Sequence, residues 1–177
     1  MSTGMSSPPS PKRRWFLKAA LAVAAVGAGI GGGVWWRRGI DGTRLTESGK
    51  EVYRAIARGM LGPMLPTEPA AREVSLARYI TQLERFINTM PSAKRDQISA
   101  LTGLLANTPT RYMVTGMWTS WADATDDQVR EALDKVRHAD NLVQNTAYAG
   151  VRGLTCLSFF TDPEHWSMVA YPGPVQI

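Results

Sequence analysis

Hydrophobic positions recur at helical spacing through most of the chain after residue 46, and this pattern predicts six helical segments. The predicted segments are about Glu47 to Leu61, Thr67 to Thr89, Ser92 to at least Leu105, a short helix or turn around Tyr112–Val114, Asp126 to Arg137, and Leu142 to Phe160. No convincing alternation of hydrophobic and polar residues indicates a strand, and no internal repeat is visible. We therefore expect an all-α fold, a small helical bundle.

Capping residues and prolines indicate where these helices begin and end. The expected N-caps are Thr46 or Ser48, Thr67, Ser92, and the turn 123–127 with its acids. Gly62 should end the first helix in a left-handed conformation, because Pro63 cannot continue it. The side chains expected to face inward are Val52, Ile56, Met60, Val74, Ile80, Leu83, Phe86, Ile87, Ile98, Leu101, Leu104, Leu105, Val129, Leu133 and Val136.

The last predicted helix and the segment after it differ from the rest of the chain. Small residues occupy the middle of this helix, at Ala147, Ala149, Gly150 and Gly153. They predict a close approach by a neighbouring backbone. The aromatic, proline-containing tail from His165 to Pro174 is expected to be extended. The helical domain is placed at residues 44–177, and the 139 residues after Arg38 are enough to form a core of their own.

Residues 1–38 have the layout of an export signal, in which basic residues precede the uncharged apolar run Ala19–Trp36. The residues that match the twin-arginine pattern Arg-Arg-x-Phe-Leu-Lys are Arg13, Arg14, Phe16, Leu17 and Lys18. Lys12 departs from the Ser or Thr that usually precedes the two arginines. The alternative is an ordinary Sec signal with two adjacent arginines, but the mildly hydrophobic, alanine- and glycine-rich run favours the twin-arginine signal.

Two fates remain open for this segment. Small residues at Gly27–Gly29 and Gly31–Gly33 suit a cleavage site, although no Ala-x-Ala triplet ends the run. The 18 residues 19–36 approach the roughly 20 that span a bilayer, and Trp35-Trp36-Arg37-Arg38 resembles an interfacial anchor. We expect a periplasmic domain preceded by either a cleaved signal peptide or an inner-membrane anchor helix.

The net charge of +5 belongs to this first segment rather than to the domain. Residues 1–38 contain six Lys and Arg and no acid, whereas residues 39–177 contain 14 Lys and Arg against 15 Asp and Glu, a net charge of −1. Nucleic-acid-binding domains concentrate basic charge on one face. The near-neutral domain therefore argues against a nucleic-acid partner.

Few residues suggest chemistry. The single cysteine excludes an internal disulfide framework and a multi-cysteine metal site. His138 and His165 are 27 positions apart and lack metal-ligand spacing, and Ser120 lacks a Gly-x-Ser-x-Gly turn. Helix capping explains Asp126 and Asp127 better than catalysis does. We therefore expect no catalytic, cofactor-binding or metal-binding residue in this chain.

For three other features the sequence suggests whether the side chains are buried or exposed. His138 is expected to be a solvated residue at a helix C-terminus. Cys156 is expected to be buried and inert, with a bond to a partner protein as the alternative. Trp118 and Trp121 are three positions apart, which would place them on one side of a helical turn, either in the core or on a partner-binding surface.

Several segments together resemble the small accessory subunits of bacterial membrane-bound flavin dehydrogenases, of the gluconate 2-dehydrogenase subunit 3 type. The similar segments, within a likeness that covers most of the chain from Leu45 onward, are Arg13-Arg14, Leu83 to Pro91, Asp126–Arg137, and the ending Phe159-Phe160-x5-Trp166-x4-Tyr171-Pro172-Gly173-Pro174. Ala170 stands where the family pattern has Gly before the Tyr. Cys156 lies about one helical turn before the position from which some relatives bridge to the flavin subunit.

This resemblance implies an escort rather than an enzyme. In such proteins the large subunit of the glucose–methanol–choline type has no signal of its own, takes up FAD in the cytoplasm and is exported while bound to the small subunit. A multihaem cytochrome c then commonly accepts the electrons. The implied partners are the flavin-dependent dehydrogenase, the twin-arginine translocase and such a cytochrome, with FAD and haem held by the partners and no cofactor in this chain.

The residues assigned to the partner interface are Trp118, Trp121, Phe160, Trp166, Tyr171, Pro172, Gly173 and Pro174. The alternative function is a free-standing, membrane-anchored helical envelope protein with no enzyme partner, and an enzyme with unrecognised acid–base chemistry is a distant third. The substrate would be determined by the large subunit, so this sequence does not identify it.

Overall fold

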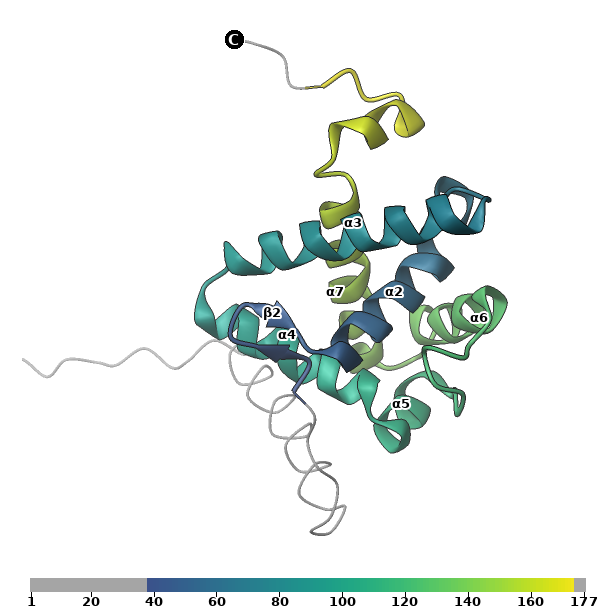
Figure 1. Cartoon of the computed structure of the whole chain (residues 1–177). Coiled ribbons are helices and arrows are strands. Elements are labelled where there is room, and N and C mark those ends of the chain that lie inside the picture. The colour runs from purple at the N-terminus through teal and green to yellow at the C-terminus, as the bar shows by residue number, and fades with distance from the viewer. Residues whose placement is uncertain (1–37, 174–177) are drawn as a thin grey trace, which may run out of the picture. The chain divides into compact units, whose positions relative to one another are not determined.

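A computed structural model of the chain describes residues 38–173. Its elements are β1 (Ile40–Asp41), β2 (Arg44–Leu45), α2 (Glu47–Leu61), η1 (Gly62–Met64), α3 (Pro69–Asn88), α4 (Ser92–Ala106), α5 (Thr108–Thr115), α6 (Asp126–Arg137), α7 (Leu142–Phe159) and η2 (Pro163–Val169). Helices dominate this part of the chain (Figure 1), so the prediction of an all-α fold is confirmed for it. The five predicted export-signal residues and Pro174 lie outside the described residues.

Helix α2 lies between two hydrophobic clusters. The tyrosine cluster includes Tyr53, Tyr79, Leu83, Ile87 and Phe159 and joins α2 to α3 and to the end of α7. The tryptophan cluster includes Ile56, Trp121, Val129, Leu133 and Val151 and joins α2 to α6, to the loop before α6 and to the middle of α7. Both clusters are built from fully or nearly fully buried side chains, so α2 is covered on two sides.

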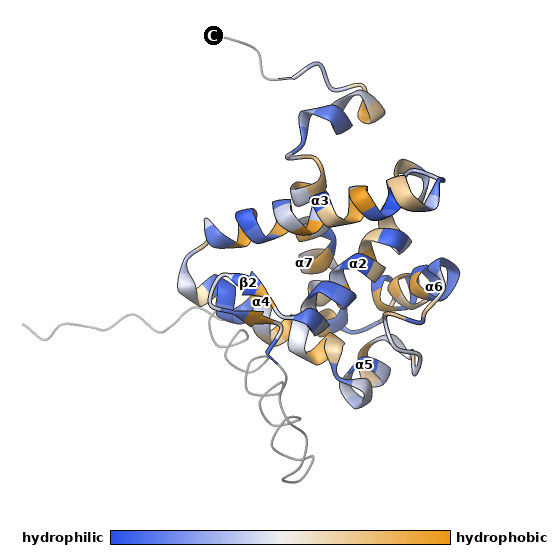
Figure 2. Ribbon diagram, viewed as in Figure 1, coloured by the Kyte–Doolittle hydropathy of each residue, from blue (hydrophilic) through white to orange (hydrophobic). Residues whose placement is uncertain are grey.

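Helices α2 and α6 form as predicted because, in each, the N-cap residue and the spacing of the hydrophobic residues indicate the same helix. The Thr46 hydroxyl accepts a hydrogen bond from the Gly49 backbone N–H at 3.1 Å. Thr125 and Gln128 form a reciprocal capping box at the start of α6. The hydrophobic stretches of α6 face α2 and its hydrophilic ones face outward (Figure 2), which buries Val129, Leu133 and Val136 as expected.

Three predicted helix caps are wrong, although α2 ends at Leu61 as predicted. Gly62 is right-handed (φ −34°, ψ −56°), because the chain continues into the short 3-10 helix η1 instead of turning away. Glu68, not Thr67, caps α3: its carboxylate accepts hydrogen bonds from the backbone N–H groups of Ala70 and Ala71, and these bonds lower the pKa of Glu68. Ser92 is the first residue of α4 and its hydroxyl makes no capping hydrogen bond.

The inward-facing stripe of α3 is also partly different from the prediction. Ile80, Leu83 and Ile87 are buried, and Phe86 is half-buried against the tyrosine cluster. Val74, however, is 64% exposed. The buried stripe begins at Leu76, and a residue two positions earlier lies about 200° around the helix, on the solvent side.

A short hairpin before α2 was not predicted from the sequence. β1 and β2 are antiparallel, with Ile40 opposite Leu45, and both side chains are buried. The preceding residue, Gly39, donates from its backbone N–H to the Ser99 carbonyl of α4 at 3.3 Å. A side chain at Gly39 would overlap that of Thr102, so the backbone approaches α4 as closely as only glycine allows. Two-residue strands leave too short a pattern of alternation to detect.

The two glycines of α7 do not receive a neighbouring backbone. A Cβ atom at Gly150 would lie 3.8 Å from the Leu101 side chain, and one at Gly153 would meet nothing within 4 Å. The predicted close approach is therefore wrong, and the buried face of α7 consists instead of Val151, Leu154, Thr155, Ser158 and Phe159.

The C-terminal tail is not extended as predicted. Asp162 caps η2 by accepting a hydrogen bond from the Glu164 backbone N–H at 3.1 Å, and Pro163 occupies the first turn. The helix ends at Ala170, which has a left-handed backbone (φ 52°). Aspartate followed by proline therefore starts a new turn of helix after α7.

Candidate interaction surfaces

Trp118 and Trp121 have opposite environments although they are three positions apart. They lie in the loop between α5 and α6 rather than on one helical turn. Trp121 is 2% exposed, and its indole N–H donates to the Leu105 carbonyl oxygen at 2.7 Å. Trp118 is 62% exposed and stacks on Tyr112, with ring centroids 4.4 Å apart. Core packing is therefore confirmed for Trp121, which is not available to a partner, whereas Trp118 lies at the surface.

Arg111, which the sequence did not single out, holds this loop in place. Its buried guanidinium donates to the carbonyl oxygens of Met117 at 3.2 Å and of Trp118 at 2.9 Å. It also donates to the Ala106 carbonyl and the Thr108 hydroxyl. Among the described residues these partners are all uncharged, and burial lowers the pKa of Arg111. The fork of N–H donors fixes the backbone that presents Trp118.

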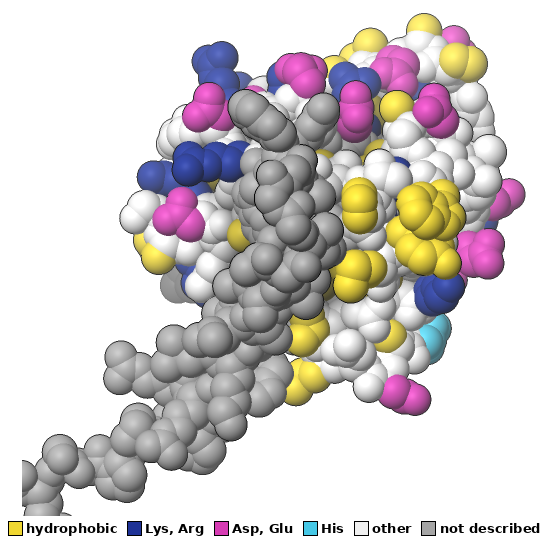
Figure 3. All heavy atoms as spheres, turned by 90° about the horizontal axis from the view of Figure 1, so that it is seen from below, with side chains coloured by type: hydrophobic (Ala, Val, Ile, Leu, Met, Phe, Trp, Pro, Cys, Tyr) yellow, Lys and Arg dark blue, Asp and Glu magenta, His cyan; other side chains and the backbone are white. Residues whose placement is uncertain are grey.

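The exposed hydrophobic residues around Trp118 form the first of two surfaces. This aromatic patch consists of Tyr112, Met113, Trp118, Leu142 and Val143. The two ends of the patch are joined by a hydrogen bond from the Gln144 side-chain amide to the Val114 carbonyl oxygen at 2.7 Å. Hydrophobic side chains gather on the face seen in Figure 3, which looks up at α5 from below.

The tail forms the second surface and contains most of the predicted interface residues. Phe160 is half-buried against the tyrosine cluster, and its carbonyl oxygen accepts a hydrogen bond from the Trp166 indole N–H at 2.8 Å. Trp166 is half-buried and meets the exposed Tyr171 edge to face at 5.3 Å. Pro172 is exposed and Gly173 lies over the Trp166 ring. The structure thus brings Phe160, Trp166, Tyr171 and Gly173 together.

A groove of about 370 Å³ separates this tail from α3. Its walls include Val74 and Arg78 of α3, and Glu164, His165 and Met168 of η2. Arg78 donates to the carboxylates of Asp162, at 3.3 Å, and of Glu164, and the carboxylates raise the pKa of Arg78. The His165 ring stacks on Phe159 at 3.8 Å, and its Nδ1 lies 2.7 Å from the Phe159 carbonyl oxygen. We call the exposed residues Met168, Val169 and Tyr171, with this groove, the tail surface.

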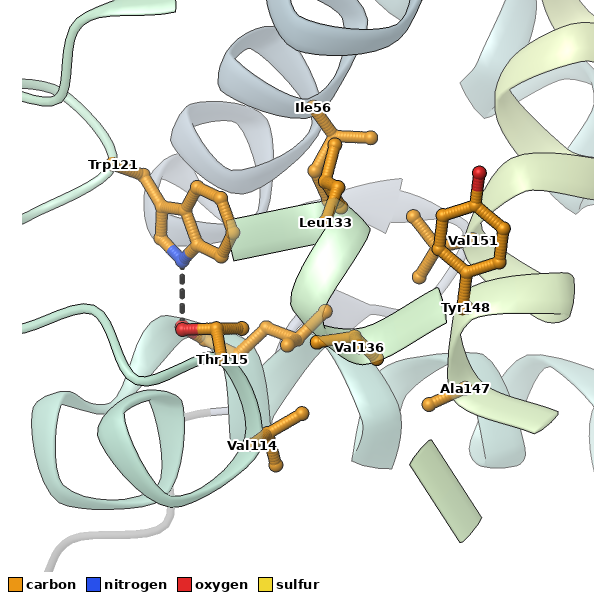
Figure 4. A pocket seen from close by; sticks show the side chains of 10 residues that line it. Ile56, Val114, Thr115, Trp121, Leu133, Val136, Ala147, Tyr148 and Val151 are labelled. Atoms are coloured by element: carbon orange, nitrogen blue, oxygen red, sulfur yellow. Dashed lines mark hydrogen bonds between the residues drawn. The ribbon is translucent and has the colours of Figure 1, made fainter. Parts of the chain in front are cut away.

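A second, much smaller cavity lies inside the tryptophan cluster (Figure 4). Its volume is about 20 Å³, and its lining includes Ile56, Trp121, Leu133 and Val151. A space of this size holds about one water molecule, and its apolar walls offer no hydrogen bonds to it. It is therefore a packing gap and not a ligand site.

The remaining histidine, cysteine and aspartate residues considered for catalysis or metal binding make structural contacts or lie at the surface. His138 is exposed at the end of α6, with Nδ1 at 2.9 Å from the Asp134 carbonyl oxygen, as predicted for a solvated helix end. Cys156 is half-buried, which is less than the predicted burial. Asp126 pairs with Arg58 and Arg72. Within residues 38–173 no cluster of three or more His, Cys, Asp or Glu is arranged to hold a metal ion.

Comparison of the chain with protein-family models, with curated proteins and with solved structures finds no match. In the part of the chain that the structure describes, no helix combines the length and the hydrophobicity needed to cross a membrane.

Proposed function

We propose that this chain is the non-catalytic small subunit of a periplasmic flavin-dependent dehydrogenase. It escorts a large subunit that has no signal of its own through the twin-arginine pathway and stays bound to it afterwards. The observation that carries the proposal is the run Arg13-Arg14-Trp15-Phe16-Leu17-Lys18 ahead of the apolar segment 19–36, which together match the layout of a twin-arginine signal. Because that pathway transports folded cargo, one signal serves two subunits.

The tail surface is the proposed contact with the large subunit. Met168, Val169 and Tyr171 expose hydrophobic area beside a groove that also contains charged Arg78 and Glu164. Interfaces commonly combine buried aromatic anchors with a polar rim. FAD belongs to the large subunit and haem to a cytochrome c that accepts its electrons.

Charge-conserving substitution of the two arginines tests the escort role. Arg13→Lys with Arg14→Lys should leave the proposed flavin-dependent large subunit, identified by its co-purification with this chain, in the cytoplasm, as measured by fractionation and FAD content. The matched control is Arg37→Lys with Arg38→Lys, which makes the same chemical change outside the signal pattern. Normal export of the oxidoreductase with the first pair would refute the escort role.

Affinity purification with mass spectrometry tests the tail contact. Trp166→Ala with Tyr171→Ala should reduce recovery of the large subunit, whereas Trp118→Ala, which removes an exposed ring elsewhere, should not. Recovery of the same complex from all variants would exclude the tail surface as the contact. The second candidate function, an anchored envelope protein without an enzyme partner, is favoured by Trp35-Trp36-Arg37-Arg38 and would give no oxidoreductase in the purification.

A further inference from the structure

The aromatic patch is held rigidly although its side chains are exposed. Trp118 is fixed twice, by stacking on Tyr112 at 4.4 Å and by the hydrogen bond from Arg111 to its carbonyl oxygen at 2.9 Å. Leu142 and Val143 are fixed through the bond between Gln144 and the Val114 carbonyl at 2.7 Å. Soluble proteins rarely expose a contiguous surface of Trp, Tyr, Met, Leu and Val side chains unless it binds a partner or a membrane.

The start of the described chain is attached close to this patch. Gly39 is hydrogen-bonded to Ser99 and packed on Thr102, both in α4. The carbonyl oxygen of Ala106, the last residue of α4, accepts a hydrogen bond from Arg111, which also donates to the Trp118 carbonyl oxygen in the patch. Ser99 and Ala106 are seven residues apart, which is about 10 Å along a helix.

The apolar run Ala19–Trp36 ends only two residues before the described part of the chain. Trp36 and Gly39 are three residues apart, and a fully extended chain covers at most about 11 Å over three residues. If residues 19–36 are retained in a bilayer, this short connection would keep Gly39 within that distance of the residue that leaves the lipid. The domain would then have no long linker with which to move away from the bilayer.

We propose that the aromatic patch rests on the surface of the bilayer that holds residues 19–36, with its rings at the level of the lipid headgroups. Trp and Tyr are the residues that favour this layer, because their rings are apolar on one side and polar on the other. Lys135 and Arg137 are close to the patch in the chain, but so are Asp134 and Asp140. With both signs of charge present, zwitterionic lipid should suffice. The proposal needs a retained anchor and does not depend on the dehydrogenase partner.

Depth-dependent fluorescence quenching in vesicles tests this contact with the full chain. In a Cys156→Ser background, Met113→Cys is labelled with a polarity-sensitive fluorophore and the protein is reconstituted into phosphatidylcholine vesicles with or without nitroxide-labelled lipid. The matched control is Val74→Cys, an exposed aliphatic position on α3, which lies on the side of the molecule away from α5 (Figure 1). We expect a blue-shifted emission and at least threefold stronger nitroxide quenching at position 113 than at position 74.

Three results would overturn the proposal. Equal quenching at both positions would show that the patch is not at the lipid surface. A blue shift at position 113 without nitroxide quenching would place protein, such as a second copy of this chain, on the patch. A mature N-terminus after residue 28 in the cellular membrane fraction would remove the anchor. None of these results affects the fractionation assay of the arginine variants, so failure of this inference and failure of the escort role are distinguishable.

Discussion

The two hydrophobic clusters on either side of α2 each support one exposed aromatic surface, but they hold it differently. The tryptophan cluster holds the aromatic patch through buried groups: Trp121 bonds to Leu105, and Arg111 bonds to the carbonyls of the loop. The tyrosine cluster holds the tail surface from its edge, through His165 on Phe159 and Trp166 on the Phe160 carbonyl.

Because their supporting contacts differ, we expect the two exposed aromatic surfaces to differ in local stability. The patch should keep its shape as long as the domain is folded, because its supports are part of the core. The tail depends on a few contacts with the last turn of α7 and on the ion pairs of the exposed Arg78 with Asp162 and Glu164, so it should open at a lower free energy than the domain unfolds. A rigid surface suits a broad planar contact, and a tail that opens separately suits a contact that forms with a particular protein.

The largest expected effect comes from Trp121. Trp121→Ala removes a buried ring and leaves the Leu105 carbonyl without its donor, so the free energy of unfolding should fall by about 3–5 kcal/mol. Trp118→Ala, three positions away, should change it by less than about 0.5 kcal/mol. Urea unfolding monitored by circular dichroism measures both. Similar losses in the two variants would contradict the distinction between support and surface.

The free energy of unfolding should fall at alkaline pH because the tyrosine side chains of the tyrosine cluster are buried. Burial raises the pKa of Tyr53 to about 12 from 10.0, so the unfolded chain ionises this phenol before the folded protein does. The contribution of this phenol to the free energy of unfolding is fully present below pH 10. It is lost as the pH rises through about 12, and the total loss is about 3 kcal/mol.

Burial also raises the pKa of Tyr79, which adds to the same slope. Tyr53→Phe should therefore flatten the dependence of unfolding free energy on pH between 10 and 12, whereas Ile56→Val, on the opposite cluster, should only lower the curve. Parallel plots of unfolding free energy against pH for the unaltered chain and both variants would show that Tyr53 is not protected from ionisation.

Arg111 should matter less for stability than Trp121 but more for the patch. Arg111→Met leaves the carbonyls of Met117 and Trp118 without their donor, at a cost of about 2–3 kcal/mol. The near-ultraviolet circular dichroism of the stacked Tyr112 and Trp118 rings should weaken at the same time. Arg54→Met, which breaks an exposed pair with Glu73, should cost less than about 1 kcal/mol and leave that signal intact.

The smallest expected effect is a gain, and it concerns the tail alone. Ala170 adopts a left-handed backbone at φ 52°, which costs an L-residue about 1–2 kcal/mol and costs glycine almost nothing. Ala170→Gly should slow hydrogen exchange at residues 165–171 by up to about tenfold without changing the global unfolding free energy. Faster exchange in the tail would show that Ala170 is not strained there.

Local signals allowed most of the fold to be predicted. The bounds of α2 and α6 follow from an N-cap and a hydrophobic stripe that agree. Val74 is hydrophobic, but its angle on α3 places it away from the buried stripe that begins at Leu76. Whether Trp118 and Trp121 are exposed or buried depends on the path of a loop that Arg111 holds by hydrogen bonds to its carbonyl oxygens. No pattern over a few positions of the sequence indicates those hydrogen bonds. The left-handed backbone of Ala170 was not predicted, because an alanine gives no local signal for a positive φ.

The close packing of Gly39 has a consequence for grafting this domain. A side chain at Gly39 would strike Thr102, and a side chain at Gly49 would strike the Gly39 carbonyl oxygen, so the first residues of the domain interlock with α2 and α4. A foreign leader, affinity tag or fusion partner must therefore be joined upstream of Gly39, with both glycines kept. A junction placed at the more obvious start of α2 would cut through the fold.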